Sequence, residues 1–121
     1  MKVKIGAIYI TVKDMDRAIS FYEKVLGQKV TEKDKRMSSF VIDGGTLLLY
    51  DSKSDGEKVK FGNNVVVTFE VDDLDAIQKI TTAKKCEVIM PVSDLGKYKI
   101  FQVKDLEGNL IEFYCEANDK K

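Results

Sequence analysis

The chain repeats one short pattern of residues, and this repeat constrains its fold more than any other feature. The stretch 71–75 (VDDLD) follows the stretch 12–16 (VKDMD) at a spacing of 59 residues. Each copy comes after an alternating, strand-like segment and before an amphipathic, helix-like segment. A unit of about 60 residues buries little surface by itself. We therefore expect two copies of one supersecondary unit, which share a core within the chain or exchange parts between two chains.

The first copy has the pattern of a strand, a helix and three further strands. Apolar residues alternate with others through residues 3–12, which predicts a strand because successive strand side chains point to opposite faces. Apolar residues then recur every three or four positions over residues 14–26, which predicts a helix. Asp14 is placed to cap the start of this helix, and Gly27 is placed to end it. Strands are expected near residues 28–33, 37–42 and 46–50.

The second copy repeats this order of elements. A polar, glycine-bearing connector spans residues 52–64, and the segment 65–71 after it predicts a strand. An apolar stripe that begins at Leu74 predicts a helix. Strands are expected near residues 87–90, 98–104 and 109–115, with Pro91 and Gly96 in the loop between the first two. The expected fold class is α+β, with two tandem βαβββ modules, about residues 1–51 and 65–116, in one domain of residues 1–121.

The charge balance excludes two classes of partner. Lysine and arginine together number 20, as do aspartate and glutamate, so the formal net charge is zero. No excess of positive charge is present to attract nucleic acid or anionic lipid. No apolar run approaches the roughly 20 residues that span a bilayer, and no signal peptide precedes the first expected strand. We expect a cytoplasmic protein that binds neither nucleic acid nor a membrane.

The sequence contains no histidine. This removes the commonest general base and metal ligand, and with it the Ser-His-Asp and Cys-His mechanisms. The two cysteines, Cys86 and Cys115, lack metal-binding spacing and are expected to be reduced, structural thiols. The aspartates at positions 14, 16, 73 and 75 fit the first turns of the two helices, where carboxylates are favourable.

One carboxylate interrupts an apolar strand near the end of the second copy. The stretch 108–114 (GNLIEFY) contains Glu112, whereas the corresponding stretch 45–50 (GTLLLY) has no charged residue. A charge in such a strand is costly unless it has a partner or a function. Glu112 could pair with a lysine or tyrosine at the sheet rim, accept a hydrogen bond from a ligand, or act as a general acid or base.

Two stretches of the sequence resemble a known family. Residues 8–30 (IYITVKDMDRAISFYEKVLGQKV) and 104–113 (KDLEGNLIEF) are similar to the two signature stretches of the vicinal oxygen chelate superfamily. This superfamily includes glyoxalases, extradiol dioxygenases, epimerases, and bleomycin- and fosfomycin-resistance proteins. The resemblance implies two βαβββ modules whose mixed sheets curl into a cup with the helices outside, usually in a homodimer. In the enzymes it also implies a divalent metal held by His, Glu or Gln on the first and last strand of each module.

Carried onto this sequence, the metal positions of the family fall on Ala7, Leu49, Val66 and Glu112. The first-strand positions lie seven residues before Asp14 and Asp73, and the last-strand positions lie four residues after Gly45 and Gly108. Three of the four side chains are hydrocarbon and supply no ligand. We therefore expect no metal and no other cofactor.

The same positions mark the strand faces that would look into the cup, because residues two apart in a strand share a face. The predicted lining is Ala7, Tyr9, Thr11, Ser39, Val41, Leu47, Leu49, Val66, Thr68, Ile100, Gln102, Leu110 and Glu112, together with Tyr98 and Tyr114. The opposite faces are expected to pack under the helices through Ile8, Ile10, Val12, Phe40, Ile42, Leu48, Val67, Phe69, Ile111 and Phe113. A largely apolar concavity with a few polar groups suits a small organic ligand.

Three functions remain open at this level. The favoured one is a metal-free small-molecule-binding protein that resembles bleomycin-resistance-type members and holds an apolar or aromatic ligand in the cup. The second is a glyoxalase-like lyase or isomerase, or a dioxygenase-related enzyme, that uses Glu112 as acid or base without metal. The third is a regulatory or interaction module in which the dimer surface matters. The balanced composition gives no sign of the acidic groove that a binder of strongly cationic compounds would need.

Overall fold

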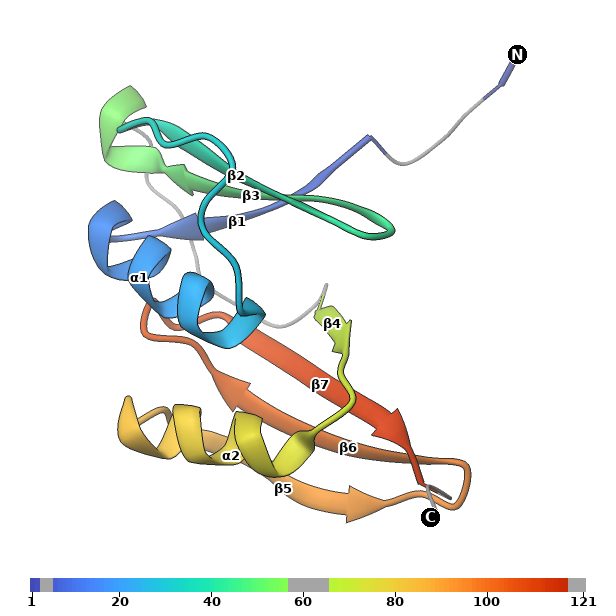
Figure 1. Cartoon of the computed structure of the whole chain (residues 1–121). Helices are drawn as coiled ribbons and strands as arrows, with labels where there is room; N and C mark the ends of the chain where they lie inside the picture. The colour runs from blue at the N-terminus through green and yellow to red at the C-terminus, as the bar shows by residue number, and fades with distance from the viewer. Residues whose placement is uncertain (3–5, 57–65, 118–121) are drawn as a thin grey trace. The chain divides into compact units, whose positions relative to one another are not determined.

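A computed structural model of the chain describes residues 1–2, 6–56 and 66–117 (Figure 1). The chain divides into two units, residues 1–61 and 62–121. Within the described residues, each unit has one α-helix and one mixed sheet, with three strands in the first unit and four in the second. The predicted α+β class is therefore confirmed. The predicted cup needs both units and stays a prediction.

The first unit is built on its three-stranded sheet. Its elements are β1 (Ile8–Val12), α1 (Met15–Leu26), β2 (Met37–Ile42), β3 (Gly45–Asp51) and the 3₁₀ helix η1 (Ser52–Asp55). The middle strand, β3, is parallel to β1 and antiparallel to β2 (Figure 1). Parallel strands need a crossover connection, and α1 lies within the one that joins β1 to the rest of the sheet.

The ends of α1 are set by the residues that the sequence predicts. Asp14 Oδ1 accepts a hydrogen bond from the backbone N–H of Arg17 at 3.1 Å. Gly27 ends the helix with a left-handed backbone at φ 68°, and its N–H donates to the carbonyl of Glu23 at 3.0 Å. The apolar stripe of α1 packs on the sheet, where the ring of Tyr22 lies 6.5 Å from the ring of Phe40.

The second unit repeats this plan with one more strand. Its elements are β4 (Val67–Glu70), α2 (Leu74–Ala83), β5 (Val88–Asp94), β6 (Tyr98–Lys104) and β7 (Leu110–Glu116). The strand order is β4-β7-β6-β5, in which β4 is parallel to β7 and the other pairs are antiparallel. Asp73 caps α2 as Asp14 caps α1, because its Oδ1 accepts from the N–H of Ala76 at 3.0 Å.

The core of the second unit lies between α2 and its sheet. Val103, Ile111 and Phe113 are fully buried in the sheet, and Leu74 and Ile77 of α2 are also buried. Burial of such side chains from water is worth roughly 1.5–3 kcal/mol each, which is the main force that holds helix to sheet. Within the described residues, no helix has the length and apolar character needed to cross a membrane.

One buried side chain organises the loop between β6 and β7. Asp105 Oδ1 accepts from the backbone N–H groups of Glu107 at 2.9 Å and of Asn109 at 2.8 Å. Its Oδ2 accepts from the side-chain amide of Asn109 at 3.1 Å. Gly108 takes the positive φ, 96°, that the turn requires. These bonds fix where β7 begins and therefore which of its residues face α2.

Two strand predictions differ from the structure. Residues 28–33 form only an isolated bridge between Glu32 and Ser39, and the N–H of Val30 donates to the Glu23 side chain instead of to a strand. Conversely, β5 continues through Pro91, which the sequence places in a loop. Proline is tolerated there because β5 is an edge strand with register shifts against β6. Parts of the predicted strands 3–12 and 65–71 lie outside the described residues.

Candidate ligand-binding site

The face of the second sheet that points away from α2 carries a row of polar side chains. In the strand register, Glu112 of β7 stands between Thr68 of β4 and Gln102 of β6. Its neighbours along the strand, Ile111 and Phe113, are buried against the helix side, so alternation turns Glu112 to the opposite face. We call this surface, with its members on β4, β6 and β7, the open face of the second sheet.

Glu112 is held by an amide. Gln102 Nε2 donates a hydrogen bond to Glu112 Oε1 at 2.8 Å, and both side chains are half-buried. The bond satisfies one oxygen of a carboxylate that would otherwise be costly to bury. Among the described residues no hydrogen bond or ion pair reaches Glu112 Oε2. The sequence predicted Gln102 and Glu112 on one face, and the structure brings them into contact.

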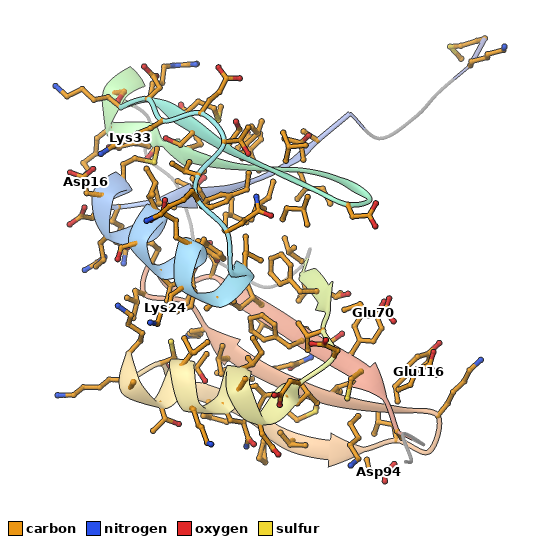
Figure 2. The ribbon with its side chains drawn as sticks, viewed as in Figure 1. Asp16, Lys24, Lys33, Glu70, Asp94 and Glu116 are labelled. Carbon is orange, nitrogen blue, oxygen red and sulfur yellow. The ribbon has the colours of Figure 1, made fainter. Side chains whose placement is uncertain are left out.

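A second row beside the first combines aromatic rings and acids. Tyr114 of β7 pairs in register with Glu70 of β4, and its ring meets the ring of Tyr98 edge to face at 5.6 Å. The ammonium of Lys97 lies 5.6 Å from the centre of the Tyr98 ring. Figure 2 shows Glu70 and Glu116 on the side of β7 away from α2.

The charge of Glu70 is the main cause that raises the pKa of the Tyr114 phenol above its usual value; burial, Tyr98 and Glu112 act in the same direction. Tyr114 therefore stays a neutral hydroxyl, able to donate, to higher pH than a free tyrosine. Glu70 was not among the predicted site residues. The signal was present, because Glu70 follows Thr68 by two positions and so shares its face.

The strand residues on the corresponding face of the first sheet are uncharged, and only some of them are exposed. Tyr9, Thr11, Ser39 and Val41 lie on the face opposite α1, as the sequence predicts, and Tyr9 and Val41 are 58% and 57% exposed. Ala7, which comes just before β1, is also exposed. Its counterpart before β4, Val66, is half-buried, and Leu110 begins β7 on the open face of the second sheet, paired with Lys104.

The predicted placement of Leu47 and Leu49 in the ligand site is wrong. They pair with Phe40 and Ser38, which are fully buried, and are themselves only 4% and 0% exposed, so they belong to the face under α1. Leu48, predicted under the helix, lies instead on the face of the first sheet opposite α1, paired with Tyr9 and Ser39.

A turn glycine explains this one-residue shift. Gly108 has its φ at 96°, and in the first unit the glycine with the matching value, 97°, is Gly44 and not Gly45. Counting four residues from Gly44 gives Leu48 as the counterpart of Glu112. The two parallel registers agree, because Tyr9 faces Leu48 where Thr68 faces Glu112.

The residues present do not fit the metal that the resemblance implies. With the corrected register, the four positions are Ala7, Leu48, Val66 and Glu112, and the first three have no donor atom. The fourth already accepts a hydrogen bond from an amide. Within the described part of the chain, no group of three or more Cys, Asp or Glu side chains could hold a metal ion.

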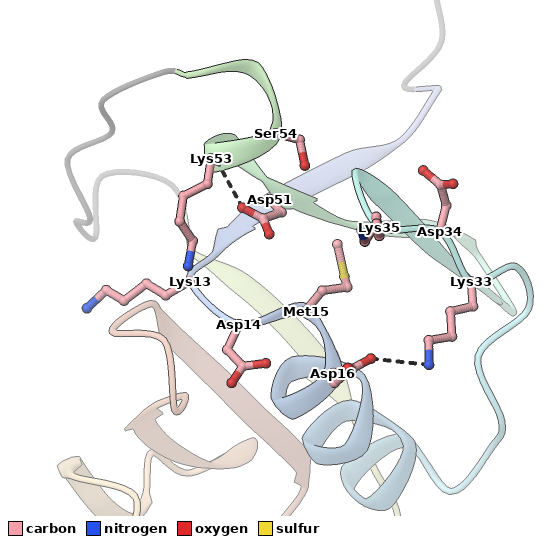
Figure 3. Close-up of a pocket in the computed structure, with 10 residues that line it drawn as sticks. All are labelled: Lys13, Asp14, Met15, Asp16, Lys33, Asp34, Lys35, Asp51, Lys53 and Ser54. Carbon is pink, nitrogen blue, oxygen red and sulfur yellow. Dashed lines mark hydrogen bonds and ion pairs between the residues drawn. The ribbon is translucent and has the colours of Figure 1, made fainter.

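A separate open pocket of about 790 Å³ lies in the first unit (Figure 3). It is lined by Lys13, Asp14, Met15, Asp16, Lys33, Asp34, Lys35, Asp51, Lys53 and Ser54. Its acids serve local structure: Asp14 caps α1, Asp51 caps η1, and Asp34 accepts from the N–H of Arg36 at 3.1 Å. The fourth, Asp16, pairs with Lys33 at 3.1 Å in the solvent. The acids of this pocket therefore have structural roles, and we do not assign it a ligand.

Comparisons with known proteins agree with this architecture. The profile of the Glyoxalase/Bleomycin resistance protein/Dioxygenase superfamily matches residues 4–113. No curated protein matches the chain.

Among solved structures, a glyoxalase/bleomycin resistance protein from Albidiferax ferrireducens T118 has a TM-score of 0.80 at 18% identity, over 93% of this chain and 98% of that one. A lactoylglutathione lyase from Agrobacterium tumefaciens has a TM-score of 0.72 at 20% identity, over 94% of both chains. TioX from Micromonospora sp. ML1 has a TM-score of 0.70 at 21% identity, over 94% of this chain and 99% of that one. At these identities the likeness shows the fold alone.

Proposed function

Because the chain belongs to the glyoxalase/bleomycin resistance protein/dioxygenase superfamily but has one carboxylate at the family's four metal positions, we propose that it binds a small organic molecule without a metal ion. The binding surface is the open face of the second sheet. The observation that carries the proposal is the hydrogen bond between Gln102 and Glu112, which orients a half-buried carboxylate beside two tyrosine rings.

The chemistry of this face suits an organic ligand. Tyr98 and Tyr114 offer apolar ring surface, and Glu112, Gln102 and Thr68 offer a few polar atoms at fixed positions. Ligand sites in proteins are usually lined in this way, with apolar area for affinity and a few polar groups for orientation. The bond from Gln102 holds Glu112 in one conformation before a ligand arrives, which lowers the entropy cost of binding.

One observation also favours an enzyme as the second candidate. Acid–base chemistry at Glu112 needs another group to polarise the substrate, and Tyr114, two residues along β7, keeps its proton because its pKa is raised by Glu70. In this alternative Glu112 takes a proton from carbon next to a carbonyl, and the Tyr114 hydroxyl donates a hydrogen bond to the carbonyl oxygen.

A thermal-shift screen with small aromatic and antibiotic compounds tests the proposal. A ligand at about 100 times its Kd adds roughly 2.7 kcal/mol to the free energy of unfolding, which corresponds to a shift of several degrees. Compounds that stabilise the wild type should lose most of that shift with Glu112→Gln. The matched control is Glu32→Gln, an exposed glutamate whose contacts with Ser39 are made by its backbone.

The outcomes separate the two candidates. A compound that binds and is recovered unchanged supports a binding protein, whereas a compound that the wild type converts and Glu112→Gln does not supports the enzyme. Stabilising compounds whose shifts are equal in the wild type and in Glu112→Gln would place binding elsewhere and contradict the proposal.

A further inference from the structure

The chain is neutral as a whole, but its charges are not evenly distributed over the second sheet. Alternation puts Glu70, Glu112 and Glu116 on the open face, and Glu116 stands opposite Tyr98 in the register. The strand residue of opposite charge on this face is Lys104, which pairs with Leu110 at the other end of β7. The end of the face that carries the tyrosines is therefore acidic, apart from Lys97 in the adjoining turn.

The charged strand residues at the tyrosine end of this face are carboxylates, which act as hydrogen-bond acceptors. One side-chain N–H of Gln102 is engaged on Glu112, and the carbonyl oxygen of the same amide is an acceptor. Glu112 Oε2 and the Glu70 carboxylate are acceptors only. A ligand that matches them has to bring donors, and a ligand that also balances their charge has to be a cation.

The aromatic pair already accepts a positive charge. Lys97 places its ammonium 5.6 Å from the centre of the Tyr98 ring, within the range of a cation–π contact. The rings of Tyr114 and Tyr98 pack edge to face, with their planes nearly perpendicular, so that a ligand placed between the two planes could contact both rings. Electron-rich ring faces and carboxylates attract the same kind of ligand.

The spacing of these groups sets the size of the ligand. Glu112 and Tyr114 are two residues apart on one strand face, a distance of about 7 Å. A primary ammonium joined to an aromatic body through one or two carbons spans this distance. We propose that the ligand is a small organic cation of this kind, with its ammonium on Glu112 and its apolar body against Tyr98 and Tyr114. This inference rests on the proposed function and specifies its ligand class.

Three matched probes test the ligand class on the full chain. They are 1-naphthylmethylamine, which is an ammonium at neutral pH, the uncharged 1-naphthalenemethanol, and the anion 1-naphthoate, all followed by naphthalene fluorescence. Because a charge-assisted hydrogen bond at a half-exposed carboxylate is worth about tenfold in affinity, we expect the amine to bind about ten times more tightly than the alcohol. We expect the carboxylate to bind most weakly.

Three variants test which residues cause the preference for the amine over the alcohol. Glu112→Gln should reduce the amine-to-alcohol ratio to near one, Tyr114→Leu should weaken both, and Glu32→Gln should change neither. Melting temperatures confirm that each variant is folded. A ratio near one in the wild type would overturn the cation inference while leaving the proposed function in place. A preference that survives Glu112→Gln, or no binding of any of the three probes, would also overturn the cation inference, and the broader screen would then test the proposed function separately.

Discussion

Glu112 and Leu48 hold equivalent positions in the two units. The residues that face them on the neighbouring antiparallel strand also differ between the units. Glu112 faces Gln102 across the antiparallel pair, whereas Leu48 faces Ser39, whose side chain is too short to reach across as Gln102 does. The carboxylate and the amide that satisfies it are thus present together in one unit and absent together in the other. A half-buried acid is tolerated where its hydrogen-bond partner is supplied by the neighbouring strand.

Partial burial of Cys86 lowers the reactivity of its thiol. Burial is the main cause that raises the pKa of its thiol from 9.0 to about 11, and the charge of Asp105 acts in the same direction. Since the thiolate is the reactive form, the rate of alkylation at pH 8 should be roughly one hundredth of that of an ordinary cysteine. The rate should continue to rise with pH beyond 9, because ionisation is shifted to higher pH.

Iodoacetamide labelling of a Cys115→Ser variant, which leaves Cys86 as the one thiol, measures this effect. The same variant unfolded in urea is the internal control, since its thiol ionises near the ordinary value. Equal labelling rates in the folded and unfolded chain at pH 8 would show that Cys86 is not protected.

At the scale of elements, the two helices end differently. Gly27 has a left-handed backbone at φ 68° after α1, whereas after α2 the residue in this conformation is Lys85, at φ 59°. A side chain at positive φ costs roughly 1 kcal/mol, which glycine avoids. We therefore expect Lys85→Gly to raise the free energy of unfolding by about 0.5–1 kcal/mol and Gly27→Ala to lower it by about 1 kcal/mol.

Urea unfolding measures both changes. Lys79→Gly is the matched control, because Lys79 is exposed in the middle of α2, where glycine should cost about 1 kcal/mol. If Lys85→Gly destabilised the chain as much as Lys79→Gly does, the positive φ of Lys85 would not carry the cost assigned to it.

Some features of the helices and strands could be predicted from the sequence, and others could not. Helix positions and caps were predictable, because the periodicity and the capping residues Asp14 and Asp73 are local signals. The register of β3 was not, because Gly44 and Gly45 are adjacent and either could take the positive φ of the turn. Pro91 was assigned to a loop because the sequence does not reveal that β5 lies at the edge of its sheet.

For the candidate site, the sequence predicted which residues of the second sheet share a face, and it missed the interactions between strands. Thr68, Gln102 and Glu112 followed from alternation alone. The hydrogen bond between the last two, and the influence of Glu70 on Tyr114, depend on strand pairing that one sequence does not specify. The predicted cup, homodimer and cytoplasmic location stay predictions.

At the scale of the whole molecule, the chain retains the fold of a family of metalloenzymes and binding proteins while its side chains at the metal positions are Ala7, Leu48, Val66 and Glu112. One carboxylate binds a divalent cation weakly, because such sites in proteins use three or more ligands. We therefore propose a binding protein, or an acid–base enzyme, that works without metal.

The most direct test of this central claim is elemental analysis of the protein purified without chelator, together with its melting temperature in the presence of Ni²⁺, Zn²⁺, Mn²⁺ or Fe²⁺. We predict less than stoichiometric metal and no rise in melting temperature, in the wild type and in Glu112→Ala alike. Stoichiometric metal in the wild type that is lost in Glu112→Ala would contradict it and return the protein to the metal-dependent enzymes of its family.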